Sequence, residues 1–210
     1  MSEWVEHQDY WECLCQQTSE EWFSIKEESK LLTCSNFGSA VGHNNFNSPD
    51  DVVEMILGKK KKEMNEAMLH GIQTEPKARK WYEERFCCKI KESGIFIPKW
   101  DLRIGASLDG EVEGTNGMIE IKCPKKMYFD LTESNVPIGN GRIISSYYDQ
   151  MQGCMAITNK EWCDFIVYCE PENRVFVKRV VFDKKYWNGV LYPKIDEFLS
   201  RMLNPICQID

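Results

Sequence analysis

Short stretches of alternating apolar and polar residues mark the middle of this chain. Residues 102–108 and 118–122 alternate in this way and contain β-branched side chains, which favours two strands. Gly114, Asn116 and Gly117 lie between them and accept the left-handed backbone angles of a tight turn. The pattern therefore predicts a β-hairpin.

The rest of the chain divides into extended and helical stretches. Two more strands are predicted over residues 163–169 and 174–181, connected by a turn at 170–173. Apolar residues at helical spacing, together with capping residues, predict helices over 3–16, over 19–32, from Ser35, over 48–58, from Pro76 through Phe86, over 143–157 and over 183–199. These elements follow one another without internal repeats.

The predicted hairpin carries three charged side chains on one face. Successive side chains of a strand point to opposite faces, so Glu120 and Lys122 point the same way. A two-residue loop at 115–116 or 116–117 pairs odd positions of the first strand with even positions of the second, which places Asp109 beside both. Two carboxylates and a lysine in this arrangement are typical of metal-dependent phosphodiesterases.

A further candidate residue, Glu75, lies directly before Pro76. Proline favours the first position of a helix because its missing N–H costs nothing there, so Glu75 is expected at the mouth of the helix. An acid at that point complements the helix dipole, which is a purely structural role. The residues alone leave the structural and the functional interpretation open.

Composition limits the class of protein. The chain has 210 residues, 42% hydrophobic and 28% charged, which suits one globular domain. It has no long apolar run and no basic-then-apolar leader, so we expect an intracellular protein, in cytoplasm or nucleus, that is neither secreted nor membrane-spanning. Its ten cysteines lack Cys-x2-Cys spacing and are expected to be reduced thiols rather than a disulfide framework or a metal cluster.

The charge balance bears on nucleic acid binding. A net charge of −7 at pH 7 argues against non-specific coating of nucleic acid, because Lys and Arg supply most of that affinity. A local basic groove stays compatible with this balance. The run Lys59–Lys62 is open to three interpretations, which are a solvated surface, nuclear targeting and phosphate contact.

Several short motifs occur in a fixed order along the chain. They are Ser35-Asn-Phe-Gly, Glu75-Pro-x-Ala-Arg79, Ser107-x-Asp109-Gly, Glu120-Ile-Lys122-Cys-Pro, Tyr147-x-x-Gln150-x-Gln152 and Trp162-Cys-Asp-Phe. Their order resembles the YqaJ-like viral recombinase family, the lambda-exonuclease branch of the PD-(D/E)xK nucleases, over about residues 30–200.

The resemblance implies a fold and a domain organisation. The fold is α/β, of mixed α+β type, with a central mixed β-sheet flanked by helices and a restriction-endonuclease-like PD-(D/E)xK core. We expect one nuclease domain over residues 1–210, with an N-terminal helical extension at 1–30 and the core at 31–203.

The resemblance also implies a metal site. By this similarity Asp109 and Glu120 would be metal-binding carboxylates, and the backbone carbonyl of Ile121 would complete the inner shell. Glu75 would act beside the metal through a water. Hard oxygen ligands suit Mg²⁺ or Mn²⁺, and two ions are expected.

Lys122 and Gln150 complete the implied catalytic set. Lys122 would orient the attacking water or take its proton, and the Gln150 amide would donate to the water or to the phosphate. Gln152 lies two residues on and cannot share that helical face, so a structural role is expected. Glu111 and Glu113 belong to no family motif and are expected to be exposed strand acids.

One departure from the family pattern concerns the DNA end. The family usually has arginine after the serine to hold a terminal 5′-phosphate, whereas this chain has Asn36, whose neutral amide cannot make the bidentate contact of arginine. Dependence on a 5′-phosphorylated end is therefore an open question. The candidate DNA or phosphate contacts are Ser35, Asn36, Ser107, Arg79, Lys125, Lys126 and Arg142.

The expected activity is that of a Mg²⁺-dependent deoxyribonuclease that degrades duplex DNA from an end, 5′ to 3′, in recombination or in viral or phage genome processing. Two alternatives stay open, which are a structure-specific or nicking endonuclease on the same site and a catalytically idle DNA-binding module. Expected partners are duplex DNA ends and, by family analogy, a single-strand annealing protein and further copies of the chain in a ring-shaped trimer.

Overall fold

A mixed five-stranded sheet forms the centre of the fold. The structure is a computed structural model that describes residues 3–44, 47–60, 64–127 and 144–203. The sheet order is β10-β9-β8-β7-β4; β8 and β9 are parallel and the other neighbours are antiparallel. The strands are β4 (Ile90–Lys91), β7 (Gly110–Val112), β8 (Gly117–Lys122), β9 (Trp162–Cys169) and β10 (Arg174–Val181). The predicted mixed α/β fold is confirmed.

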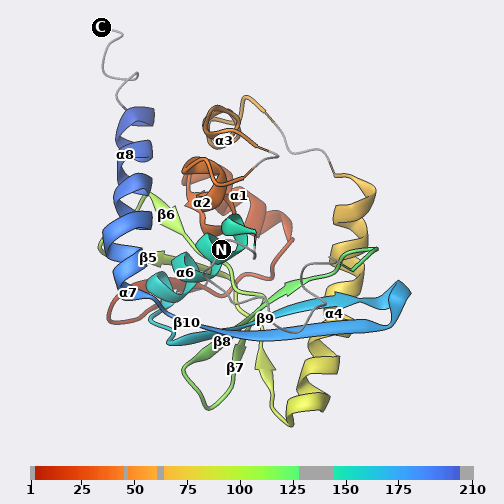
Figure 1. Cartoon of the computed structure of the whole chain (residues 1–210). Helices are drawn as coiled ribbons and strands as arrows, with labels where there is room; N and C mark the ends of the chain where they lie inside the picture. Colours follow the sequence, from red (N-terminus) through yellow and green to blue (C-terminus); the bar gives the residue numbers. More distant parts are fainter. Residues whose placement is uncertain (1–2, 45–46, 61–63, 128–143, 204–210) are drawn as a thin grey trace, which may run out of the picture.

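Helices cover both faces of this sheet (Figure 1). On one face, Ile119 and Ile121 of β8 share an apolar cluster with Ala78 and Tyr82 of α4 (Glu66–Phe86). On the other face, Met118 belongs to the larger cluster, which includes buried side chains of α6 (Ser145–Thr158). Because side chains alternate along β8, the even positions Glu120 and Lys122 belong to the α6 side.

The hairpin that carries the predicted acids is shorter than expected. Its strands are β7 and β8, with Gly110 opposite Ile119 and Val112 opposite Gly117. The turn therefore spans residues 113–116 rather than two residues, and Gly114 takes a positive φ of 72° there. Lengthening the loop by an even number of residues keeps the parity of the pairing, so Asp109, one residue before the Gly110–Ile119 pair, stays on the same face as Glu120.

The predicted strand over residues 102–108 is mostly wrong. The strand there is β6 (Ile104–Gly105), which pairs in parallel with β3 (Leu32–Thr33) rather than with β8, and Ala106 adds a single antiparallel bridge to Phe96. The alternating pattern reflects burial of Ile104, Ala106 and Leu108 beneath neighbouring segments. Alternate residues of a segment can be buried without the segment forming a continuous strand of a sheet.

The N-terminal helix predicted over residues 3–16 is also wrong. The chain forms β1 (Trp4–Glu6) and β2 (Tyr10–Cys13) there, and both join β5 (Ile95–Pro98) in an antiparallel sheet. Pairing with a strand more than eighty residues away overrides the local spacing, and that partner cannot be seen in a local pattern. Within residues 3–30, the described part of the predicted helical extension, α1 (Glu20–Glu28) is the only helix, and Ser19 caps it as predicted.

Helix α4 begins ten residues earlier than predicted. Asn65 caps it, and Pro76 lies inside the helix instead of at its first position. Glu75 is therefore in mid-helix. A proline in that position leaves a carbonyl of the preceding turn without its usual donor, but the flanking turns continue the helix.

The remaining helices follow the predicted order. They are η1 (Cys34–Asn36), α2 (Phe37–Ala40), α3 (Pro49–Ile56), α7 (Lys184–Tyr186), the π-turn η3 (Trp187–Leu191) and α8 (Tyr192–Leu203). Ser48 caps α3 and Asp183 caps α7. Among the described residues, the cysteines are all free, and no helix is both long and apolar enough to span a bilayer.

Candidate active site

Asp109 and Glu120 face each other where β7 begins. Asp109 is the residue before β7, and its Oδ2 accepts a hydrogen bond from the backbone N–H of Ile121 at 2.6 Å. This bond fixes the carboxylate against the edge of β8. Burial raises the pKa of Asp109, and the positive charge of Lys122 offsets part of that rise.

Glu120 is fully buried, and one of its carboxylate oxygens is unsatisfied. Its Oε1 accepts from Lys122 Nζ at 2.5 Å, whereas Oε2 has no hydrogen-bond partner among the residues that the structure describes. Burial, followed by the charge of Asp109, raises the pKa of Glu120 to about 8. An orphaned buried carboxylate oxygen is costly unless a cation or a donor reaches it.

Lys122 links the two acids to α6. Its Nζ lies 3.4 Å from Gln150 Oε1 and 5.0 Å from the centroid of the Tyr147 ring. Burial alone would lower the pKa of this ammonium group, but the charges of Glu120 and Asp109 outweigh burial and raise the pKa. Lys122 is therefore a cation at neutral pH.

Glu75 approaches the group from α4. Its Oε1 accepts from Arg79 Nη2 at 2.8 Å, one helical turn away. Burial and then the charge of Asp109 raise the pKa of Glu75 to about 7, while Arg79 and Lys122 lower it. The structure thus brings five predicted residues together from three elements and the segment before β7, namely Glu75, Asp109, Glu120, Lys122 and Gln150.

Arg79, predicted as a phosphate contact, is used inside the protein. Its Nε donates to the Asp109 carbonyl at 3.1 Å, Nη2 donates to Glu75, and Nη1 donates to Glu92. Its side chain is only 16% exposed. With its fork occupied by protein acceptors, Arg79 is placed to support Asp109 and Glu75 rather than to bind a phosphate.

The other candidate phosphate contacts near the site also have protein partners. Ser107 Oγ accepts from Trp22 Nε1 at 3.2 Å. Ser35 Oγ lies 3.2 Å from Thr33 Oγ1, and Asn36 Nδ2 reaches the same hydroxyl at 3.5 Å. Their predicted contact with a phosphate stays a prediction.

The basic residues predicted to contact phosphate after β8 are Lys125, Lys126 and Arg142. Lys125 forms an ion pair with Glu66 at 3.1 Å, with both side chains exposed, and Lys126 is exposed. Arg142 lies outside the described residues. Exposed ion pairs are weak, so Lys125 can exchange its partner readily.

Three polar residues of the predicted motifs and hairpin, Gln152, Glu113 and Glu111, lie outside the site. Gln152 donates to the Val181 carbonyl at 3.0 Å and accepts from Asp183 N at 2.7 Å, so it joins α6 to the end of β10. Glu113 is exposed as predicted. Glu111 is not, because Lys160 at 2.7 Å and Lys91 at 3.4 Å pair with its carboxylate and its side chain is 15% exposed.

The sequence did not reveal the side chains that hold the segment before Asp109. Trp22 binds Ser107, and Gln17 binds the carbonyl of Leu108. Both are more than eighty residues away along the chain, and neither residue type has a local signal for such a contact.

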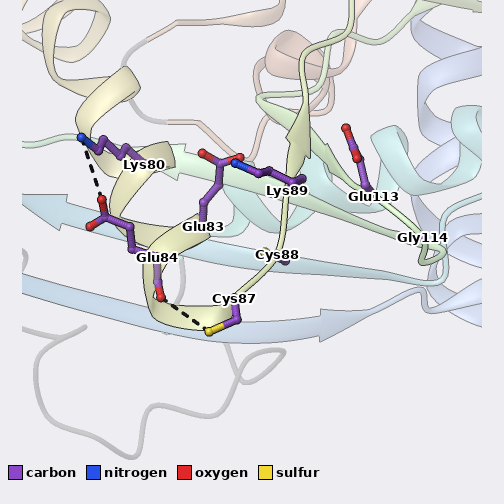
Figure 2. Close-up of a pocket in the computed structure, with 8 residues that line it drawn as sticks. All are labelled: Lys80, Glu83, Glu84, Cys87, Cys88, Lys89, Glu113 and Gly114. Carbon is purple, nitrogen blue, oxygen red and sulfur yellow. Dashed lines mark hydrogen bonds and ion pairs between the residues drawn. The ribbon is translucent and has the colours of Figure 1, made fainter.

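An open pocket of about 810 Å³ lies at the C-terminal end of α4 (Figure 2). Its lining mixes both signs of charge and is formed by Lys80, Glu83, Glu84, Cys87, Cys88, Lys89, Glu113 and Gly114. The Lys80–Glu84 pair at 3.9 Å occupies part of its wall. None of the candidate site residues lines it, so it is not the active site.

The chain matches the model of the YqaJ-like viral recombinase domain over residues 21–161. Among curated proteins, none matches it. Among solved structures, it is similar to an alkaline exonuclease (LHK-Exo) from Laribacter hongkongensis, with 27% identity and a TM-score of 0.72 over 90% of this chain and 94% of that one.

Two further solved structures are similar. The same exonuclease in complex with dAMP gives 26% identity and a TM-score of 0.73, over 90% of this chain and 94% of that one. A phage related exonuclease from Haemophilus somnus 129PT gives 16% identity and a TM-score of 0.59, over 82% of this chain and 91% of that one, and supports the fold alone.

The family match covers most of the chain, and the similar structures are exonucleases. Both comparisons indicate a nuclease of the exonuclease type. The chain belongs to the YqaJ-like viral recombinase domain family.

Proposed function

We propose that this protein is a deoxyribonuclease that uses Mg²⁺ or Mn²⁺ to hydrolyse duplex DNA from an end, in the 5′ to 3′ direction. The observation that carries the proposal is the orphaned Oε2 of Glu120, buried beside Asp109 and Lys122. Burial raises the pKa values of both carboxyl groups, and a divalent cation held by them would stabilise their ionised forms.

The donor set fits a hard cation. Asp109 and Glu120 would hold the ion, with the Ile121 carbonyl completing the shell and Glu75 acting through a water. In the described part of the chain, no group of three or more His, Cys, Asp or Glu side chains is arranged as a complete set of metal ligands. This suits Mg²⁺, which keeps several waters and commonly takes only one or two carboxylates along with substrate phosphates. When bound, such an ion polarises the phosphate and lowers the pKa of a water.

Two side chains would act on the reacting groups themselves. Lys122 is held as a cation between Glu120 and Gln150, where its N–H groups can orient a water or contact the scissile phosphate. The Gln150 amide presents its oxygen to Lys122, which leaves its N–H₂ end to donate to a phosphate oxygen.

The choice of a DNA end as substrate is supported by similarity. The related Laribacter hongkongensis protein is described as an alkaline exonuclease and binds dAMP, a deoxynucleoside monophosphate of the kind an exonuclease releases. The 5′ to 3′ direction, a ring-shaped trimer and a single-strand annealing partner rest on family analogy alone.

A nicking or structure-specific endonuclease is the second candidate, and Asn36 favours it. This residue replaces the family's arginine, and its amide reaches the Thr33 hydroxyl at 3.5 Å, a neutral partner. Without a cationic grip on the terminal phosphate, the site would depend less on a free end.

The test uses linear duplexes labelled at the 5′ or the 3′ end, and a covalently closed circle, each with Mg²⁺ or with a chelator. We expect Mg²⁺-dependent release of mononucleotides from linear duplex, early loss of a 5′ label and an intact circle. Nicking of the circle would support the endonuclease. DNA binding without cleavage of any substrate would favour the idle binding module and contradict the proposal.

A further inference from the structure

Asp109 is carried by a segment that lies outside the sheet ladders. Strand β6 ends at Gly105 and β7 begins at Gly110. Buried backbone carbonyls outside a ladder need donors from elsewhere. The position of the Asp109 carboxylate therefore depends on which groups bind the carbonyls of Leu108 and Asp109.

Gln17 supplies the donor for Leu108. Its Nε2 lies 2.6 Å from the Leu108 carbonyl oxygen and 2.8 Å from the Ser93 carbonyl oxygen. A primary amide has two N–H groups, so both are used in this bridge. The Ser93 hydroxyl also donates to the Leu108 carbonyl, at 3.3 Å.

The surrounding packing leaves this bridge little freedom. Leu108 is fully buried, and a Cβ added at Gly94 would lie 2.0 Å from the carbonyl oxygen of Cys13. The N-terminal strands thus run directly over the segment that follows Ser93. A shift at Gln17 would be transmitted to Leu108 and its neighbour Asp109.

We propose that Gln17 is a positioning residue for the Asp109 carboxylate. It lies in the N-terminal segment, before residues 21–161, which match the family model. The inference rests on the proposed function, because it assigns Gln17 a role in the geometry of the metal-binding carboxylates.

The test replaces Gln17 with Glu, which keeps the shape but turns a donor into an acceptor against two carbonyl oxygens. Gln17→Leu removes the donors without adding charge, and serves if Gln17→Glu fails to fold. Gln16→Glu is the matched control, because Gln16 is the exposed neighbour and the charge change is the same. Two quantities are measured: Mn²⁺ affinity by calorimetry without DNA, and kcat and KM on linear duplex.

We expect either Gln17 variant to weaken Mn²⁺ binding and to lower kcat, by about 10- to 100-fold each, with KM for DNA little changed. A merely structural role would lower thermal stability but would leave Mn²⁺ affinity, kcat and KM of the folded variant close to those of wild type. Wild-type Mn²⁺ affinity and kcat in a folded Gln17 variant would overturn the inference alone. A wild-type protein that neither binds Mn²⁺ nor cleaves DNA would overturn the proposed function, and the inference with it.

Discussion

At the level of single residues, the site is defined by carboxyl groups whose pKa values are raised, so that the folded protein favours their neutral form. Burial raises the pKa values of Asp109, Glu120 and Glu75 together, and Lys122 is the cation in direct contact with Glu120. Such clustering of shifted groups is typical of functional sites. The three carboxyl groups with raised pKa values all lie in the family motifs.

The Arg79 guanidinium joins three acceptors around the site, and this contact can be tested by substitution. Arg79→Lys keeps the charge but loses the fork that joins Glu75, Glu92 and the Asp109 carbonyl, because an ammonium group cannot span three separate acceptors in that plane. We expect kcat on duplex DNA to fall by about 10- to 100-fold with KM little changed. Lys80→Ala, an exposed change on the next residue of α4, is the control and should cleave like wild type. A large rise in KM alone would instead indicate that Arg79 binds DNA.

At the scale of elements, close contacts between helices position the side chains of the candidate active site. Helix α2 packs on α6 at Gly38, where an added Cβ would lie 2.5 Å from Ser146 Cα. Ser146 is one turn before Gln150, so this contact sets how deeply α6 seats against β8 and Lys122.

Gly38→Ala should therefore force α2 and α6 apart. Overpacking of this kind costs about 1–3 kcal/mol of unfolding free energy, measurable by chemical denaturation. Gly71→Ala is the matched helical control, because nothing lies within 4 Å of a Cβ there, and it should stabilise the protein by about 0.5–1 kcal/mol. Equal effects of the two substitutions would contradict the tight docking of α2 on α6.

Elements also show what the sequence can and cannot predict. The sequence predicts the parity of the β7–β8 hairpin correctly, because residues 113–116 form a loop of even length, which keeps Asp109 and Glu120 on the same face. Strands β9 and β10 and the caps Ser19 and Ser48 followed from local chemistry.

The error at the N-terminus and the missed contacts around the site share one physical cause, which is dependence on distant partners. Strands β1 and β2 exist because β5 pairs with them, and local spacing suggested a helix instead. Likewise, the engagement of Arg79 with Glu92, and of Gln17 with Leu108, depends on chain segments that meet only in the folded protein. The residue types in the site could be predicted, whereas its supporting contacts could not.

At the scale of the whole molecule, the buried acids link stability to pH. Glu75 and Glu120 have pKa values of about 7 and about 8 in the folded protein, above the ordinary value of 4.5. The native state therefore binds more protons than the unfolded state between about pH 4.5 and pH 8, and stability falls as pH rises through that window. A divalent cation bound to these acids would favour their ionised forms and so oppose this loss.

Thermal unfolding checks this linkage. In a chelator, Tm should fall steadily between about pH 5 and pH 8.5, and added Mn²⁺ should raise Tm more at pH 8.5 than at pH 5.5. Each kcal/mol lost lowers Tm by about 2–4 °C in a chain of this size. Glu120→Gln, which cannot ionise at this position, should flatten the slope. An increase in Tm from pH 5 to pH 8.5 in the chelator would contradict raised pKa values of Glu75 and Glu120 in the folded protein.

The most direct test of the metal-dependent nuclease is cleavage of linear duplex DNA over a range of Mg²⁺ concentrations. It compares wild type with Asp109→Ala, Glu120→Gln and Lys122→Ala, each checked for folding. We expect wild-type cleavage that requires the cation and a loss of at least about 100-fold in each variant, because the residues act as one unit. Equal cleavage by all four proteins, or wild-type cleavage that persists in a chelator, would contradict a metal site at Asp109 and Glu120.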